Sequence, residues 1–137
     1  MKRYIEQVDH TEPIGVVYCD ITGLKRTNDS EGHSTGDRLI CRCCDCLKRV
    51  FEGNGMFRIG GDELVVLCTG ISEKEFYQKV EELKTELAAH DVSMAVGAAV
   101  NTLEAVGKDH LLTESERRMY QDKAEYYRST GLDRRKV

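Results

Sequence analysis

The chain has 137 residues, enough for one domain with a single hydrophobic core of ordinary size. Its composition, 40% hydrophobic and 32% charged, is typical of a soluble globular protein, with neither an apolar run of membrane-spanning length nor the apolar segment of a signal peptide. A net charge of −4 argues against a nonspecific nucleic-acid binder. We therefore expect a domain in the cytoplasm, or on the cytoplasmic side of a larger membrane-anchored protein, that itself contacts neither nucleic acid nor membrane.

The first predicted strand covers residues 14 to 19. Residues 1 to 11 before it are compatible with a short helix that Pro13 ends. The strand itself is a near-continuous apolar run, which is typical of a strand covered on both faces. It ends in Asp20. A carboxylate at the end of a buried strand marks a candidate site, and the alternative is a helix cap or a turn residue.

A helix is predicted after the polar loop that extends to residue 37, with Ser34 or Thr35 as its cap. Residues 52 to 55 would close this helix and lead into the next element. Four apolar residues at spacings of four, four and three would form its buried face: Leu39, Cys43, Leu47 and Val50.

A β-hairpin around an acidic turn is predicted over residues 57 to 67. Its two arms are rich in aromatic and β-branched residues, and its tip reads Gly60-Gly61-Asp62-Glu63. Glycine at such a tip has two uses, because it permits positive φ and lets a ligand approach the main chain closely. A carboxylate pair beside the glycines suggests a metal ion and a phosphate, and the alternative is a turn with a polar tip.

Two helices and one strand are predicted in the second half of the chain. Residues 92 to 100 read as a strand in which larger and small residues alternate, so that one face would let another element approach closely. The last helix would run from about Leu112 to Arg128. The helix before the strand would be capped by Ser72 and bury one stripe of residues: Phe76, Val80, Leu83 and Leu87.

This order of elements predicts an α/β (α+β) domain in which helices pack on a mixed sheet. In a βαββαβ arrangement of the ferredoxin-like or palm type, the end of the first strand lies beside the tip of the central hairpin. Asp20 and Asp62, far apart in the sequence, would then face each other.

The six cysteines do not form the pattern of a disulfide framework, and in a reducing compartment they would be small core residues or surface thiols. Four of them lie in one predicted helix, where their side chains fan out to several faces, and no matching pair follows at a zinc-like spacing. We therefore do not expect a structural metal at Cys41, Cys43, Cys44 and Cys46.

A series of short motifs extends along most of the chain, in this order: Asp20-Ile21, Lys25, Asn28-Asp29, Gly32-His33, Gly36-Asp37, Arg58, Gly60-Gly61-Asp62-Glu63-Leu64, Met119-Tyr120, Lys123 and Gly131. In this respect the sequence resembles the GGDEF family of diguanylate cyclase domains. The resemblance implies a nucleotidyl-cyclase-like fold and an enzyme that condenses two GTP into cyclic di-GMP and pyrophosphate. It also implies a homodimer in which each half holds one GTP.

The resemblance assigns Mg²⁺ or Mn²⁺ to Asp20, the main-chain carbonyl of Ile21, and Asp62. Carboxylate-bound metal fits phosphoryl transfer, which needs charge neutralisation and positioning more than covalent help. Asp62 and Glu63 would be the catalytic carboxylates. Glu63 would be either a further metal ligand or the group that helps to deprotonate the attacking 3′-hydroxyl, and both roles stay open.

The same resemblance implies the residues that bind GTP. Asn28 and Asp37 would read the guanine edge by donor and acceptor pairing, and their alternatives are a turn residue and a helix N-terminal charge. Main-chain N–H groups around Gly23 and Leu24 would bind the triphosphate. Two cations would add phosphate contacts: Lys123 and Arg134.

The chain departs from the family pattern at three positions. Leu64 replaces the Phe of the family name, an apolar change that activity should survive, and Thr22 stands where an acidic residue is common. The window of the family's product-inhibition motif, Arg-x-x-Asp, reads Phe51-Glu52-Gly53-Asn54, so we expect no product-inhibition site.

The Asp-x-Leu-Thr opening of the family is missing. We therefore expect residues 1–137 to be a single domain that is N-terminally truncated relative to the family, with a sensory or other domain outside this sequence. The alternative to an enzyme is a catalytically silent GGDEF module that binds GTP or a protein partner and regulates an adjacent domain. A third hypothesis is a related nucleotidyl cyclase with another purine substrate or a mixed product.

Overall fold

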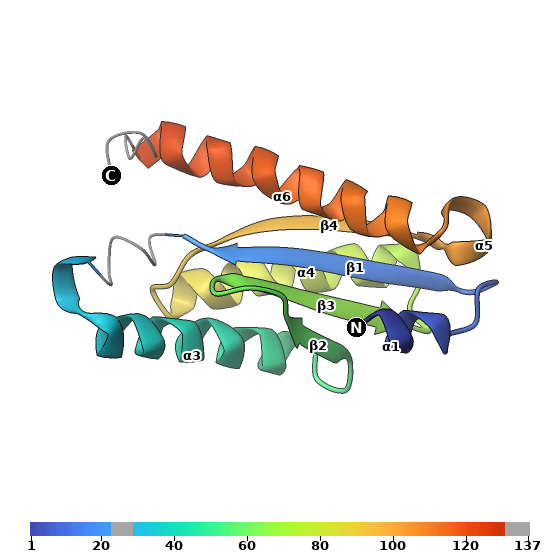
Figure 1. Cartoon of the computed structure of the whole chain (residues 1–137), viewed down its shortest axis with the longest axis horizontal. Coiled ribbons are helices and arrows are strands. Elements are labelled where there is room, and N and C mark those ends of the chain that lie inside the picture. The colour runs from blue at the N-terminus through green and yellow to red at the C-terminus, as the bar shows by residue number, and fades with distance from the viewer. Residues whose placement is uncertain (23–28, 131–137) are drawn as a thin grey trace.

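The computed structural model describes residues 1–22 and 29–130. In this part of the chain, four strands form one sheet that is covered by helices (Figure 1). In chain order they are α1 (Lys2–Glu6), β1 (Pro13–Ile21), α3 (His33–Val50), β2 (Gly55–Arg58), β3 (Glu63–Thr69), α4 (Glu73–Ala89), β4 (Met94–Thr102), α5 (Leu103–Val106) and α6 (Lys108–Thr130).

The four strands form one sheet in the order β2-β3-β1-β4, which confirms the predicted βαββαβ sheet with helices packed on it. Each neighbouring pair is antiparallel, so the expectation of a mixed sheet is wrong. The reason is that β1 and β2, joined through α3, run in the same direction but are separated by β3. In the same way β1 separates the co-directional β3 and β4.

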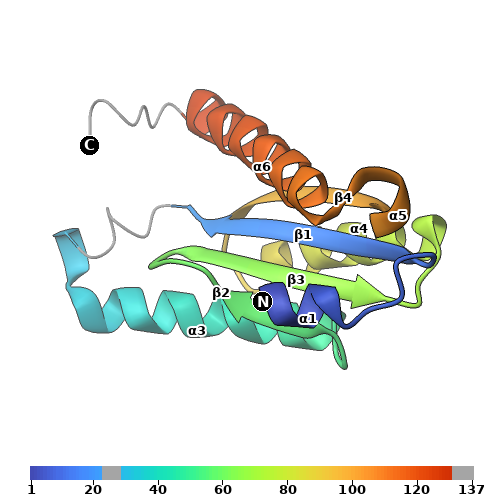
Figure 2. The ribbon, with the colours of Figure 1, turned by 45° about the vertical axis from the view of Figure 1, so that its right-hand side comes forward.

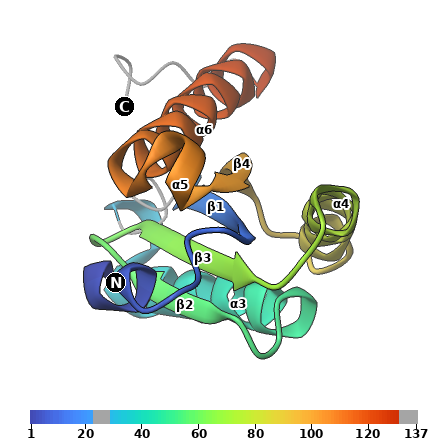
Figure 3. The ribbon, with the colours of Figure 1, turned by 90° about the vertical axis from the view of Figure 1, so that its right-hand side faces the viewer.

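Helices cover both faces of the sheet, and β1 is buried along almost its whole length (Figures 2 and 3). On one face, Val17, Cys19 and Ile21 of β1 pack in a cluster with residues of α3 and α4. On the other face, Val16 and Tyr18 pack in a cluster with residues of α1, α5 and α6. Alternate residues of β1 therefore point to opposite cores, and residues 14, 16, 18 and 20 share the α6 face.

Helix α6 lies directly against β4, which explains the small residues of that strand. A Cβ built on Gly97 would lie 2.1 Å from the carbonyl oxygen of Ser115 and 2.2 Å from the amide nitrogen of Met119. The prediction that one face of this strand lets another element approach closely is thus confirmed.

Side chains of α6 also bond the outer edge of β4. The carboxylate of Asp122 accepts a hydrogen bond from the Val96 N–H at 2.8 Å. The guanidinium of Arg118 donates to the carbonyl oxygen of Ala98 at 2.6 Å.

The predicted helix faces are confirmed, and some boundaries differ. In α4, Ser72 is the N-cap and its hydroxyl accepts from the Glu75 N–H at 3.2 Å, and the four predicted stripe residues are its buried ones. Helix α3 begins at His33 with Gly32 as its N-cap residue, so the prediction of Ser34 or Thr35 as cap is wrong. Strand β4 lies two residues later than predicted, and α6 begins four residues earlier, at Lys108.

The cysteines are free thiols, as expected. Cys41 is exposed and Cys44 half-buried, and the other four belong to the core between the sheet and the helices α3 and α4: Cys19, Cys43, Cys46 and Cys68. Within residues 1–22 and 29–130, no helix combines the length and apolarity needed to cross a bilayer.

Candidate functional site

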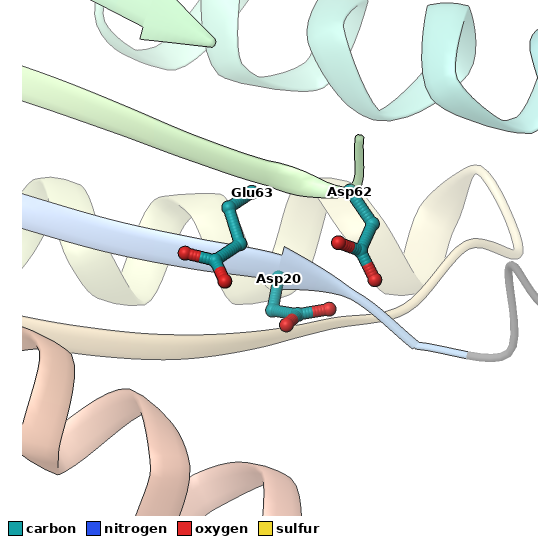
Figure 4. Close-up of side chains that lie close together, drawn as sticks. All are labelled: Asp20, Asp62 and Glu63. Carbon is teal, nitrogen blue, oxygen red and sulfur yellow. The ribbon is translucent and has the colours of Figure 1, made fainter. Parts of the chain in front are cut away.

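Three carboxylates meet at one end of the sheet (Figure 4). Asp20 near the end of β1 lies opposite Glu63, the first residue of β3, in the strand register. Asp62 immediately precedes β3, and its carbonyl oxygen accepts from the Ile21 N–H at 2.9 Å. One oxygen from each of Asp20, Asp62 and Glu63 lies within 4.8 Å of the others. The expectation that Asp20 and Asp62 face each other is therefore confirmed.

The hairpin that carries Asp62 and Glu63 is closed by backbone and side-chain bonds. The Ile59 N–H donates to the carbonyl of Glu63 at 2.9 Å. The guanidinium of Arg58 donates to the carbonyl oxygens of Gly60 and Gly61, at 3.2 and 2.7 Å. One arginine therefore fixes both glycine carbonyls of the turn.

Neither glycine of the tip adopts positive φ, so their conformational freedom is not what the turn requires. A Cβ on Gly60 or Gly61 would also have no atom of the described residues within 4 Å. Of the two uses predicted for these glycines, only the second remains, which is room for a molecule to approach the main chain.

Asp20 is 2% exposed and has two differently placed oxygens. Oδ2 accepts from the ammonium of Lys123 on α6 at 3.0 Å. Oδ1 is buried and has no hydrogen-bond partner among the described residues. Burial raises the pKa of Asp20, the ion pair with Lys123 opposes that rise, and the nearby Asp62 and Glu63 add to it.

The donor set fits a hard divalent cation. Mg²⁺ and Mn²⁺ prefer oxygen ligands, and one or two carboxylates are enough when phosphate oxygens and water complete the coordination. The unpartnered Oδ1 of Asp20 is a buried acceptor, and leaving such a group unsatisfied is unfavourable. Asp20, Asp62 and Glu63 form the single group of three or more potential metal-binding His, Cys, Asp or Glu side chains in the described part of the chain.

Glu63 has a second contact, which the sequence reasoning missed. The hydroxyl of Tyr18 on β1 donates to Glu63 Oε2 at 2.8 Å. Burial raises the pKa of Tyr18, and hydrogen bonding to Glu63 and to Glu116 of α6 adds to the rise, so the hydroxyl stays protonated. The available signal was position, because Tyr18 is two residues before Asp20 and must share its face of the strand.

The remaining predicted site residues lie in several places. Asp37 is exposed on the first turns of α3, whose start lies at the same end of the molecule as the end of β1 and the hairpin tip (Figures 1 and 2). Lys123 was predicted to contact phosphate and is found on Asp20. Four predicted substrate residues lie outside the described part of the chain: Gly23, Leu24, Asn28 and Arg134.

The window of the product-inhibition motif forms the turn after α3. Phe51 is 3% exposed and packs in the core. The side-chain amide of Asn54 donates back to the carbonyl oxygen of Phe51 at 3.2 Å. These two residues therefore serve the local fold of the turn.

Comparison with known proteins supports one family. The family model described as "Diguanylate cyclase, GGDEF domain" matches residues 1–128. Diguanylate cyclase DosC of Escherichia coli (strain K12) is 32% identical over 111 residues, which cover 72% of this chain and 24% of that protein. Diguanylate cyclase DgcS of Shewanella oneidensis is 28% identical over 117 residues, which cover 81% of this chain and 39% of that protein. The chain thus spans less than half the length of these curated relatives.

Solved structures show the same fold. The GGDEF domain of DgcB from Caulobacter crescentus, solved in complex with c-di-GMP, aligns with a TM-score of 0.77 at 19% identity, covering 90% of this chain and 80% of that one. The active GGEEF domain of a diguanylate cyclase from Vibrio cholerae aligns with a TM-score of 0.75 at 19% identity, covering 84% and 79%. Together with the family match over residues 1–128, these findings show that the chain belongs to the GGDEF family of diguanylate cyclase domains.

Proposed function

We propose that this domain is a metal-dependent diguanylate cyclase, which condenses two GTP into cyclic di-GMP and pyrophosphate. The observation that supports it most directly is the convergence of Asp20, Asp62 and Glu63, with one oxygen of each within 4.8 Å of the others. A module that only bound a protein partner would have no use for a buried, unpartnered carboxylate oxygen beside two further carboxylates.

Asp20, the main-chain carbonyl of Ile21, and Asp62 would hold Mg²⁺ or Mn²⁺, with Glu63 as a further ligand or as the base. When bound, the metal would neutralise part of the negative charge on the triphosphate. Asp20 is fixed by its strand and by burial, and Asp62 by the bond between its carbonyl and the Ile21 N–H. As a base, Glu63 would accept the proton of the 3′-hydroxyl at a carboxylate oxygen.

GTP would be held by groups around these carboxylates. Asn28 and Asp37 would read the guanine, and main-chain N–H groups at Gly23 and Leu24 would bind the phosphates. Lys123 can bind a phosphate while it stays paired with Asp20. Its ammonium has three N–H donors, and Asp20 Oδ2 uses one of them. Arg134 would be a further phosphate contact. The uncrowded glycines of the hairpin tip leave the main chain open to such a ligand.

Catalysis would take place in a homodimer. The reaction joins two GTP molecules, and the described residues of one chain contain a single three-carboxylate group. Two copies facing each other would bring the two nucleotides together. Without the Arg-x-x-Asp motif at residues 51 to 54, we propose that the product does not inhibit through that site.

The test is to incubate concentrated protein with GTP and Mg²⁺ and to separate the products by chromatography. Cyclic di-GMP is expected from the parent and from Asp45→Ala, which removes an exposed carboxylate of α3. We expect Asp62→Ala to reduce the rate by about 10²-fold or more, because one transition-state contact is lost. Tight GTP binding without product, even in a forced dimer, would favour the silent regulatory module instead.

A further inference from the structure

Tyr18 contacts the carboxylate site from within the sheet. It is 7% exposed, and its hydroxyl donates to Glu63 Oε2 at 2.8 Å. In the strand register Tyr18 lies opposite Val65, two residues beyond Glu63, so the two side chains are diagonal neighbours on the α6 face. This contact ties the first residue of β3 to a buried position of β1.

The surroundings of Tyr18 restrict where its hydroxyl can lie. On the β4 side its partner in the register is Gly97, where α6 packs directly on the strand. The side chain of Tyr18 therefore lies between the sheet and α6, in the cluster that contains Val65 and Met119. A phenol ring held on two sides has few rotamers, so its hydroxyl keeps one position, within hydrogen-bonding reach of the carboxylates of Glu63 and Glu116.

Among the residues that the structure describes, Tyr18 alone is seen to donate a hydrogen bond to the carboxylate of Glu63. Glu63 is half-buried and begins a strand next to a turn. With Oε2 engaged by Tyr18, the carboxylate is held in one rotamer, in which one of its oxygens lies within 4.8 Å of an oxygen of Asp20 and of Asp62; Figure 4 shows the three side chains together. A freely rotating glutamate would spend only part of its time in that position.

We propose that Tyr18 is a positioning residue that orients Glu63 toward Asp20 and Asp62 through its hydroxyl. The inference rests on the proposed function for the role of Glu63 in the reaction. It can be tested without turnover, because ordering of the carboxylate group also affects the affinity for a divalent cation.

The experiment measures Mn²⁺ affinity by electron paramagnetic resonance and cyclase kinetics on the same proteins. Tyr18→Phe keeps the ring and removes the hydroxyl. We expect Mn²⁺ affinity or kcat to fall by about 10-fold to 100-fold, with KM for GTP changed by less than about 3-fold. The matched control is Tyr4→Phe, a tyrosine that packs edge-on against Phe57, and it should change neither quantity.

A double-mutant cycle separates positioning from a merely structural role. If Tyr18 acts through Glu63, the double variant Tyr18→Phe/Glu63→Gln should match Glu63→Gln alone in Mn²⁺ affinity. Additive losses would overturn the inference, and so would a wild-type protein that binds no Mn²⁺. Unchanged kcat and affinity in Tyr18→Phe with an active parent would overturn the inference and leave the proposed function standing. Lowered Mn²⁺ affinity in Tyr18→Phe with an inactive parent would support the positioning by Tyr18 and count against the proposed function.

Discussion

Asp20 and Lys123 form an ion pair whose side chains are 3% and 10% exposed. Removing the cation from such a pair leaves an uncompensated buried carboxylate, which is costly. We expect Lys123→Met to lower the free energy of unfolding by about 3 kcal/mol, measured by urea denaturation in the presence of a chelator. The control is Lys84→Met, which breaks an exposed pair with Glu81 and should cost less than about 1 kcal/mol.

Asp20→Asn in the Lys123→Met background should recover most of the lost stability, because the unpaired charge is then gone. Equal effects of Lys123→Met and Lys84→Met would show that the buried pair does not stabilise the fold. A Lys123→Met variant that the Asn substitution fails to rescue would indicate packing of the lysine stem as the cause.

At the scale of single residues, the sequence predicted which carboxylates meet but not what holds them. Asp20 and Asp62 could be brought together because a strand order followed from the pattern of elements. The contacts of Lys123 with Asp20 and of Tyr18 with Glu63 depend on how closely the last helix and the strands approach. Such approach distances are set by packing, which no local pattern in the sequence encodes.

At the scale of elements, the closeness of α6 to β4 depends on Gly97. A methyl group there would overlap backbone atoms of Ser115 and Met119, which cannot rotate away as a side chain would. We expect Gly97→Ala to lower the free energy of unfolding by about 3 kcal/mol in thermal or urea denaturation. Because α6 carries Lys123, we also expect activity to fall.

The matched control is Gly61→Ala in the hairpin tip. Gly61 has no positive φ, and an alanine Cβ there would have no atom of the residues that the structure describes within 4 Å, so stability should change by less than about 1 kcal/mol. If Gly97→Ala proved as stable as Gly61→Ala, α6 would be able to shift outward without loss, and the close contact would not matter for the fold.

The elements differ in how well local sequence determines them. The cap and the buried stripe of α4 follow from signals within one helix, so they could be predicted. Helix α3 begins directly after Gly32, whose φ of 89° glycine readily adopts. The nearby Ser34 and Thr35 are also suitable cap residues, so residue type alone did not identify the start. Whether neighbouring strands are parallel or antiparallel depends on the order of the strands in the sheet. That order is a property of the complete sheet.

At the scale of the whole molecule, the cysteines report on global unfolding. Burial raises the pKa of Cys43 and of Cys68 to about 12, so neither is a thiolate at pH 8. We expect Cys41 to react quickly with a thiol reagent at pH 8 and Cys44 more slowly. The four buried cysteines should react only at the rate of unfolding, and denaturant should release all six.

The number of quickly labelled sites, counted by mass spectrometry, checks this expectation. Because the raised pKa values keep these groups neutral, labelling of Cys43 and Cys68 should stay slow up to about pH 9. Rapid modification of three or more cysteines in the native protein would show that the core between the sheet and α3 opens easily.

Asp122 accepts a hydrogen bond from β4 and Arg118 donates one to it, which affects how copies of this protein can associate. These hydrogen bonds occupy groups on the outer edge of β4 that a strand from another molecule would have to bond. At the opposite edge, β2 has only four residues. The sheet is therefore a poor template for strand addition, so polymerisation through continuous sheets is disfavoured. We therefore expect two copies of this chain to pair through surfaces other than the edges of the sheet.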